Sequence, residues 1–172
     1  MKILTIRLKV SDVIYDIRNK AWLTARARDN GTNFKQVAFL KPDNEGGDLS
    51  QLMRSVIGAW RKLLALFAEY IPADEDVPDE DFVADADADT RLEYLEQTLW
   101  MPNNFNEGLR ATIADTAHKY VVARALGEWL RLNVSADADK FLAEAEALYG
   151  EIWTSLGARV RPERPGTKTA NS

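Results

Sequence analysis

The segment from Asp48 to Ile71 constrains the fold most, because its apolar residues recur at spacings of three and four. Such spacing lines them up along one side of an α-helix. Asp48 and Gln51 resemble a capping box at its start, and Pro72 ends it. The apolar positions are Leu52, Met53, Val56, Ile57, Trp60, Leu63, Leu64, Phe67 and Ile71. The sequence therefore predicts a long amphipathic helix whose apolar side packs against other parts of the protein.

Three more segments have helical periodicity. The segment from Asn106 to Leu132 has so wide an apolar stripe that we expect a central helix with neighbours on more than one side. Asn104 and Glu107 are predicted to cap its start. Another long helix is predicted from Ser135 to Leu156, and a shorter one from Ser11 to about residue 28.

The N-terminal ten residues alternate apolar and polar side chains, which predicts a strand with one buried face. The buried positions would be Leu4, Ile6, Leu8 and Val10. Residues 36–40 are a candidate for a second short strand. Residues 91–102, RLEYLEQTLWMP, fit pieces of both a helix and a strand. A strand is favoured, paired as a hairpin with residues 81–84.

Together these segments predict a mainly α fold, a helical bundle of three long helices and one shorter helix with a minor N-terminal and central β element. At 172 residues the chain fits one domain. We place that domain at residues 1–158, with an acidic loop or hairpin at 73–90. Residues 159–172 are predicted to be a basic, flexible C-terminal tail, because they combine prolines, a glycine and small polar residues.

Charge is distributed unevenly along the chain. Nine acidic residues and no lysine or arginine fall between Asp74 and Asp89, although the net charge is only −5. The rest of the chain has 22 basic and 18 acidic residues. The tail has little apolar material with which to fold on its own domain, so its cations are available to a partner. The predicted partner-binding residues are Arg159, Arg161, Arg164 and Lys168.

The acidic block continues into a sequence that resembles a calcium loop. Asp85, Asp87 and Asp89 alternate, and Glu96 closes a window of twelve residues as in an EF-hand. However, Thr90 stands where the EF-hand turn has glycine, and Pro78 makes a poor incoming helix. We therefore expect a solvated loop or hairpin turn without specific calcium binding.

The sequence offers no catalytic constellation. Cysteine is absent, and His118 is the single histidine, more consistent with core or interface packing than with catalysis, although Asp115 is close enough in sequence to modulate it. The sequence has no P-loop, dinucleotide fingerprint or nucleophile elbow. We therefore predict no enzymatic activity, no cofactor and no metal site.

Binding features in the sequence are weak. The five tryptophans are assigned to the core or to a subunit interface rather than to a ligand cage. Arg26, Arg28 and the tail arginines would give at most salt-sensitive phosphate binding without sequence-specific recognition of nucleic acid. Because Arg7 and Lys9 interrupt the apolar residues at the N-terminus, we predict neither a signal peptide nor a membrane span. A soluble, unexported protein is expected.

The C-terminal half resembles a known class of proteins. EGLRATIADTAHKYVVARALGEWLRLN, followed by a turn and a helix ending LYGEIWTSLGARVRPERP, is similar to small helical virion proteins of tailed phages and prophages of the head-tail connector or neck adaptor type. LSQLMRSVIGAWRKLLALFAEYI looks like the first long helix of such connectors. The likeness covers about two thirds of the chain and consists of helix order, aromatic placement and a basic end.

The resemblance implies a non-enzymatic structural subunit that forms a homo-oligomeric ring between portal and tail proteins, in the virion or the host cytoplasm. A chain with separated charges is compatible with this, since an acidic region can contact the basic tail of a neighbour and close into a ring. The alternative is a soluble helical protein-binding regulatory module.

Overall fold

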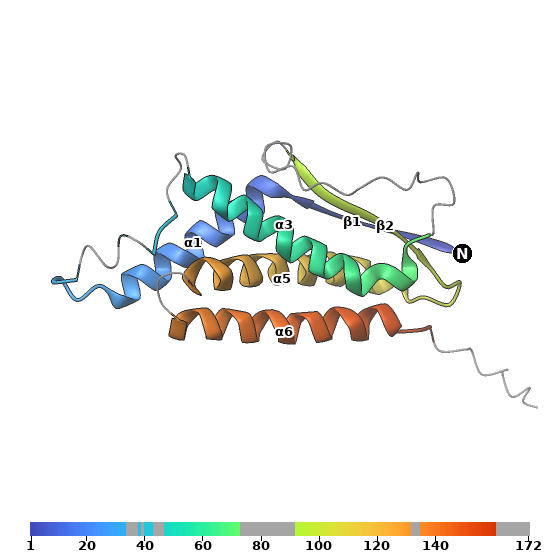
Figure 1. The fold of residues 1–172 in the computed structure, drawn as a ribbon. Coiled ribbons are helices and arrows are strands. Elements are labelled where there is room, and N and C mark those ends of the chain that lie inside the picture. Colours follow the sequence, from blue (N-terminus) through green and yellow to red (C-terminus); the bar gives the residue numbers. More distant parts are fainter. Residues whose placement is uncertain (34–37, 39, 43–46, 73–91, 132–134, 161–172) are drawn as a thin grey trace, which may run out of the picture.

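The computed structural model describes residues 1–33, 38, 40–42, 47–72, 92–131 and 135–160 (Figure 1). Four α-helices and two strands make up its main elements. They are β1 (Lys2–Lys9), α1 (Val10–Arg28), α3 (Gly47–Phe67), β2 (Tyr94–Met101), α5 (Arg110–Arg131) and α6 (Ser135–Gly157). Two short 3-10 helices, η1 (Ala68–Tyr70) and η2 (Glu107–Leu109), follow α3 and precede α5.

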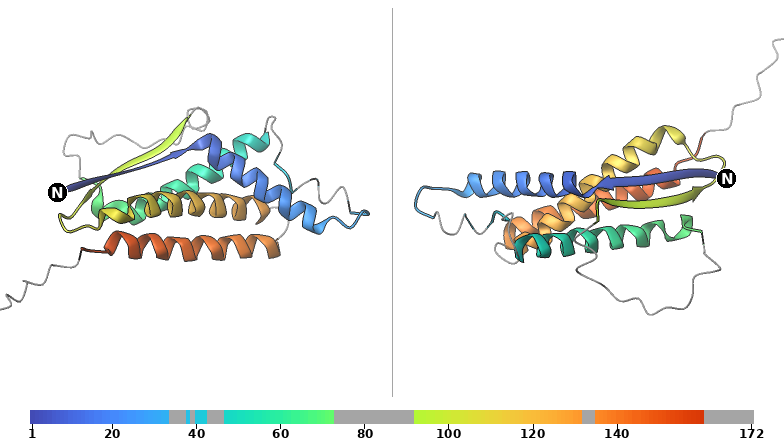
Figure 2. Two further views of the ribbon diagram at one scale, coloured as in Figure 1. Left: turned by 180° about the vertical axis from the view of Figure 1, so that it is seen from behind. Right: turned by 90° about the horizontal axis from the view of Figure 1, so that it is seen from above.

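Helix α5 is the centre of the domain, as its wide apolar stripe predicts. Figure 1 shows α6 running along one side of α5, with α3 and the sheet on the other. Seen from above in Figure 2, α1 extends beyond the sheet and also packs against α5. Buried residues therefore occur all round α5: Ile113, Thr116, Ala117, Tyr120, Val121, Val122, Ala123, Ala125, Leu126, Gly127, Trp129 and Leu130.

Strands β1 and β2 pair antiparallel, with Lys2 opposite Met101 and Lys9 opposite Tyr94. The alternation of β1 places Leu4, Ile6 and Leu8 on the inner face, where they are buried. Leu95 and Leu99 of β2 lie opposite Leu8 and Leu4 on the same face. A ribbon of two strands is marginal by itself, so packing of this face on the helices must stabilise it.

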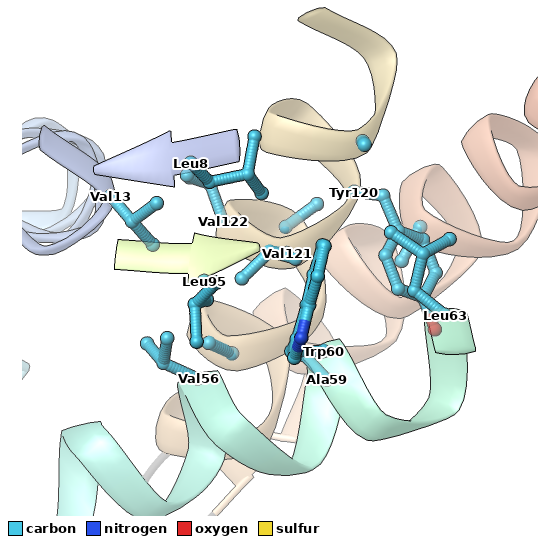
Figure 3. Packing of buried hydrophobic residues seen from close by; sticks show 14 of the residues in the cluster. Leu8, Val13, Val56, Ala59, Trp60, Leu63, Leu95, Tyr120, Val121 and Val122 are labelled. Atoms are coloured by element: carbon cyan, nitrogen blue, oxygen red, sulfur yellow. The ribbon is translucent and has the colours of Figure 1, made fainter. Parts of the chain in front are cut away.

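The main core lies between the sheet, α3 and α5. Figure 3 shows Leu8 and Leu95 from the sheet, Trp60 from α3 and Val121 from α5 meeting in one cluster. Trp60 is buried and packs edge to face on Phe67, with ring centroids 6.5 Å apart. Burial of such large side chains supplies the dominant favourable free energy of folding.

Two ion pairs at partly exposed positions attach α1 to α6. Lys20 Nζ lies 3.3 Å from Glu144 of α6. Arg28 Nε lies 2.6 Å from Asp137, near the start of the same helix. Since α1 also buries Val13 and Ile17 in the core, these contacts orient the helix rather than supply most of its stability.

The predicted fold class is confirmed in outline, because the domain is mainly helical with a small sheet. The distinction between three long helices and one shorter helix is small, since α1, α3, α5 and α6 contain 19, 21, 22 and 23 residues. The helical signal of 48–71 ends as α-helix at Phe67 and continues as η1.

Other details differ from the expectations. Asn104 is not the cap before α5; instead the side chain of Asn106 accepts from the Gly108 N–H and begins η2. Ala38 is helical and Leu40 lies in a turn, so neither forms the short strand predicted for 36–40; the other three residues lie outside the described chain. Residues 91–102 do contain a strand, whose observed partner is β1. The predicted partner, 81–84, and the acidic segment 73–90 also lie outside the described residues.

Candidate interaction surfaces

Helix α1 presents large apolar side chains to solvent on the side opposite its buried residues. Tyr15 is 69% exposed, Trp22 41% and Leu23 51%. They share this side with Asp12, Asn19 and Arg26, which are also exposed. We call these six residues the outer α1 face. The guanidinium of Arg26 lies over the Trp22 ring, 5.1 Å from its centroid, a cation–π contact.

The outer face of the sheet is the second exposed apolar surface. Ile3 and Trp100 are cross-strand neighbours, and each is about half exposed. Apart from the Tyr94 ring, over which Arg7 lies, the rest of this face is polar: Thr5 and Thr98 hydroxyls lie 3.2 Å apart, and Arg7 Nε lies 3.0 Å from Glu96. The apolar part of the face is therefore at the end of the sheet that contains the N-terminus.

The five tryptophans divide into two groups. Trp60 and Trp129 are buried, and the Trp129 indole donates a hydrogen bond to the Leu40 carbonyl. Trp22, Trp100 and Trp153 are 41–51% exposed, on α1, β2 and α6. Tryptophan is enriched where binding energy concentrates in protein interfaces. The expected core position is thus confirmed for Trp60 and Trp129, while an interface role of the three exposed residues stays a prediction.

Of the predicted partner-binding cations, Arg159 alone lies in the described chain. Its guanidinium donates to the carbonyls of Leu156 and Ala158 at the end of α6. The backbone beside it is held as well, since the Val160 N–H donates to the Asn104 carbonyl at 2.8 Å. Residues 159 and 160 are therefore attached to the domain. Arg161, Arg164 and Lys168 lie outside the described residues, and their predicted role stays a prediction.

His118 links two helices. Its Nε2 lies 2.8 Å from Asp16 Oδ2, which joins α5 to α1 at a site where the histidine side chain is 23% exposed. Asp115, expected to influence this histidine, instead pairs with Lys119 at 2.6 Å. No group of three or more potential metal ligands occurs within the described part of the chain. The geometry is that of a helix–helix contact.

A second polar cluster joins α5 to α6. Arg124 lies 3.2 Å from Glu128 and 3.0 Å from Glu146. Nearby, the buried Tyr120 ring packs at 5.9 Å on Tyr149. Burial raises the pKa of the Tyr120 hydroxyl above its ordinary value, and the charge of Arg124 partly opposes this rise. Tyr120 is therefore neutral at physiological pH and acts as a core residue.

A pocket of 230 Å³ lies where β1 joins α1, beside the start of α3. Among the described residues its lining is largely apolar, with Val10, Ile14 and Met53 as contributors and Glu93 as the ionisable group. Sites for small ligands have volumes of about 300–1,000 Å³ and several convergent polar groups. This pocket is smaller than those sites and offers little polar recognition.

The calcium-like sequence ends in a strand. Glu96 would be the twelfth ligand of an EF-hand, which is followed by a helix. Here Glu96 lies within β2 and pairs with Arg7. An EF-hand is thus excluded at this end of the sequence, while residues 85–91 lie outside the described chain.

No protein-family model, curated protein or solved structure matches the chain. Within the residues that the structure describes, no helix is long and apolar enough to cross a bilayer. Sequence reasoning missed the outer α1 face, although a signal was present. Tyr15, Trp22 and Leu23 fall on the helix side opposite Val13 and Ile17, which are buried.

Proposed function

We propose that this protein is a non-enzymatic assembly protein that acts by self-association or by docking to a larger assembly. The observation that supports this most is the exposure of Tyr15, Trp22 and Trp100 on the surface of an otherwise well-packed domain. Aromatic side chains of this kind bury a large area at low entropic cost in protein contacts. Apolar surface on α1 and on the sheet would therefore provide most of the affinity.

The finer proposal is a ring-forming subunit of the phage head-tail connector or neck adaptor type. It rests on the resemblance of the C-terminal half and on the charge separation between the acidic segment and the basic tail. In such an assembly, portal or tail proteins would be the partners. Contacts between exposed charges are individually weak and are screened over about 8 Å at physiological ionic strength, so the tail contribution should fall with added salt.

The experiment compares the full chain with a chain ending at Val160, which retains the residues attached to the domain. Light scattering across protein and salt concentration gives the mass of each, and electron microscopy tests for rings. We expect both chains to associate, with the shorter chain weaker at low salt and the difference lost at high salt.

If both chains associate equally, the proposed role of the tail is wrong, but the proposed self-association stands. A monomer that captures one defined partner from a lysate of the source cell would favour the regulatory binding module. Two chains that remain monomeric and capture no partner would overturn the proposal.

A further inference from the structure

We propose that the outer α1 face binds a second copy of this chain, helix against helix, in an antiparallel contact with twofold symmetry. This inference deepens the proposed function by naming the partner, and it rests on that function. The same surface patch would contact itself in the two copies, as isologous symmetry requires.

The spacing of the outer α1 face fits another helix. Asp12, Tyr15, Asn19, Trp22 and Arg26 follow one another at intervals of three, four, three and four residues, and all five are exposed. This is the heptad interval that brings two helices together along one line of side chains. Leu23 lies beside that line and is 51% exposed. An outward heptad line on a helix whose opposite side is already buried is available for a second helix.

The charges at the two ends of the outer α1 face favour a second copy of the same helix in the antiparallel orientation. Asp12 lies in the first turn of α1 and Arg26 in the last. In an antiparallel pair, the first turn of one copy lies beside the last turn of the other, so Asp12 faces Arg26 twice. A parallel pair would instead bring the two Asp12 carboxylates together and the two Arg26 guanidiniums together. The face is therefore complementary to itself in the antiparallel direction.

These two charges are available for such a contact. Other charged groups of α1 are held by the domain: Asp16 by His118, Lys20 by Glu144 and Arg28 by Asp137. Neither Asp12 nor Arg26 forms an ion pair with a described residue. The Asp12 carboxylate accepts from the neighbouring Ser11 hydroxyl, and Arg26 lies over Trp22.

The centre of the face is also self-complementary. Asn19 is midway between Asp12 and Arg26, so the twofold axis would pass beside it. An asparagine amide donates and accepts, and two of them facing each other can exchange hydrogen bonds. A single polar asparagine in an apolar helix seam fixes register and partner number at some cost in stability. Tyr15 and Trp22 flank this centre and would supply the apolar contact.

The contact should be weak. Asp12 and Arg26 are about 21 Å apart along the helix axis. A seam of that length buries less than the roughly 800 Å² per partner of a standard interface. We expect dimers with a dissociation constant on the order of tens of micromolar. The contact closes at two copies and is separate from any contact that the tail makes.

The test exchanges the charges in the full chain and measures association by sedimentation. Asp12→Arg and Arg26→Asp, each alone, place like charges opposite one another, and each should weaken the dimer by roughly tenfold. The double exchange should restore it. An equimolar mixture of the two single variants should also dimerise, since the two cations of one copy then face the two anions of the other.

Trp22→Ala should weaken the dimer as well, whereas Trp153→Ala, which removes a similarly exposed tryptophan from α6, should not. Circular dichroism melting confirms that each variant is folded. Association that is indifferent to the charge exchanges and to Trp22→Ala would overturn the α1 contact while leaving the proposed function intact. A monomeric wild type that docks to a different partner would also overturn it, and a monomer without any partner would overturn both.

Discussion

At the scale of single residues, Gly127 shows how closely α5 and α6 pack. A β-carbon at this position would lie 2.8 Å from Cγ and Cδ2 of Leu142. At Gly58, within α3, an added β-carbon would meet no described atom within 4 Å apart from its chain neighbours and the backbone of its own helix. A side chain at position 127 would therefore clash with Leu142, whereas position 58 has room for one.

We predict that Gly127→Ala lowers the free energy of unfolding by about 1–3 kcal/mol, because Leu142 or the helix must shift. Gly58→Ala should raise it by about 0.4–1 kcal/mol, since alanine restricts the unfolded chain without a clash. Urea denaturation of both variants measures the difference. A neutral or stabilising Gly127→Ala would show that the two helices are further apart than described.

Tyr120 provides a pH-dependent test of the core. Its pKa is raised above the ordinary 10.0 by burial, so the folded protein keeps the hydroxyl proton at a pH where the unfolded chain loses it. The unfolded state then binds fewer protons, and stability falls as pH rises above the unfolded pKa of about 10.

The free energy of unfolding of wild type minus that of Tyr120→Phe should therefore be constant up to about pH 10 and decrease above it. Denaturant titrations between neutral and alkaline pH give this difference, and the variant removes the background from lysines. If the free energies of unfolding of the two proteins instead differ by a constant amount over the whole pH range, Tyr120 is solvated in the folded state.

At the scale of elements, β1 has two faces with different roles. Ile6 is fully buried against the helices, whereas Ile3 on the opposite face is 59% exposed. Ile6→Ala should cost about 2–5 kcal/mol through lost burial and a residual cavity. Ile3→Ala should change stability by less than about 0.5 kcal/mol. Equal effects in thermal or urea unfolding would mean that β1 is not packed through one face.

The helices and β1 could be predicted from the sequence because their periodicity is local. Val13 and Ile17, or Leu4 and Ile6, show by spacing alone which side is buried. The pairing of β2 could not be predicted in the same way. Alternation in residues 94–101 says which side chains share a face, but not that Leu99 lies opposite Leu4. That choice depends on how α3 and α5 bring distant strands together.

Helix caps and exposed surfaces are also difficult to predict from local sequence alone. From the sequence, Asn104 and Asn106 are both suitable N-cap residues. In the structure the cap is Asn106, whose side chain accepts a hydrogen bond from the Gly108 N–H. Trp22 and Trp60 both lie on amphipathic helices, yet one is exposed and the other buried. A composition rule for tryptophan cannot separate them, whereas the helix side on which each residue falls can.

At the scale of the whole molecule, exposed apolar side chains occur on separate surfaces. Trp22, Trp100 and Trp153 lie on α1, β2 and α6, while the described pocket is small and apolar. Under the proposed function these exposed side chains make protein contacts, whereas the pocket offers little for recognition of a small ligand. If apolar contacts dominate, association must persist when salt screens the charges.

The central claim is tested most directly by sedimentation equilibrium of the full chain. Protein is varied from about 5 to 500 µM, at salt concentrations of about 0.15 and 1 M. We predict an average mass that rises above the 19.4 kDa of one chain as concentration increases, at both salt concentrations. A mass of 19.4 kDa under every condition, together with no partner captured from a lysate of the source cell, would contradict the account.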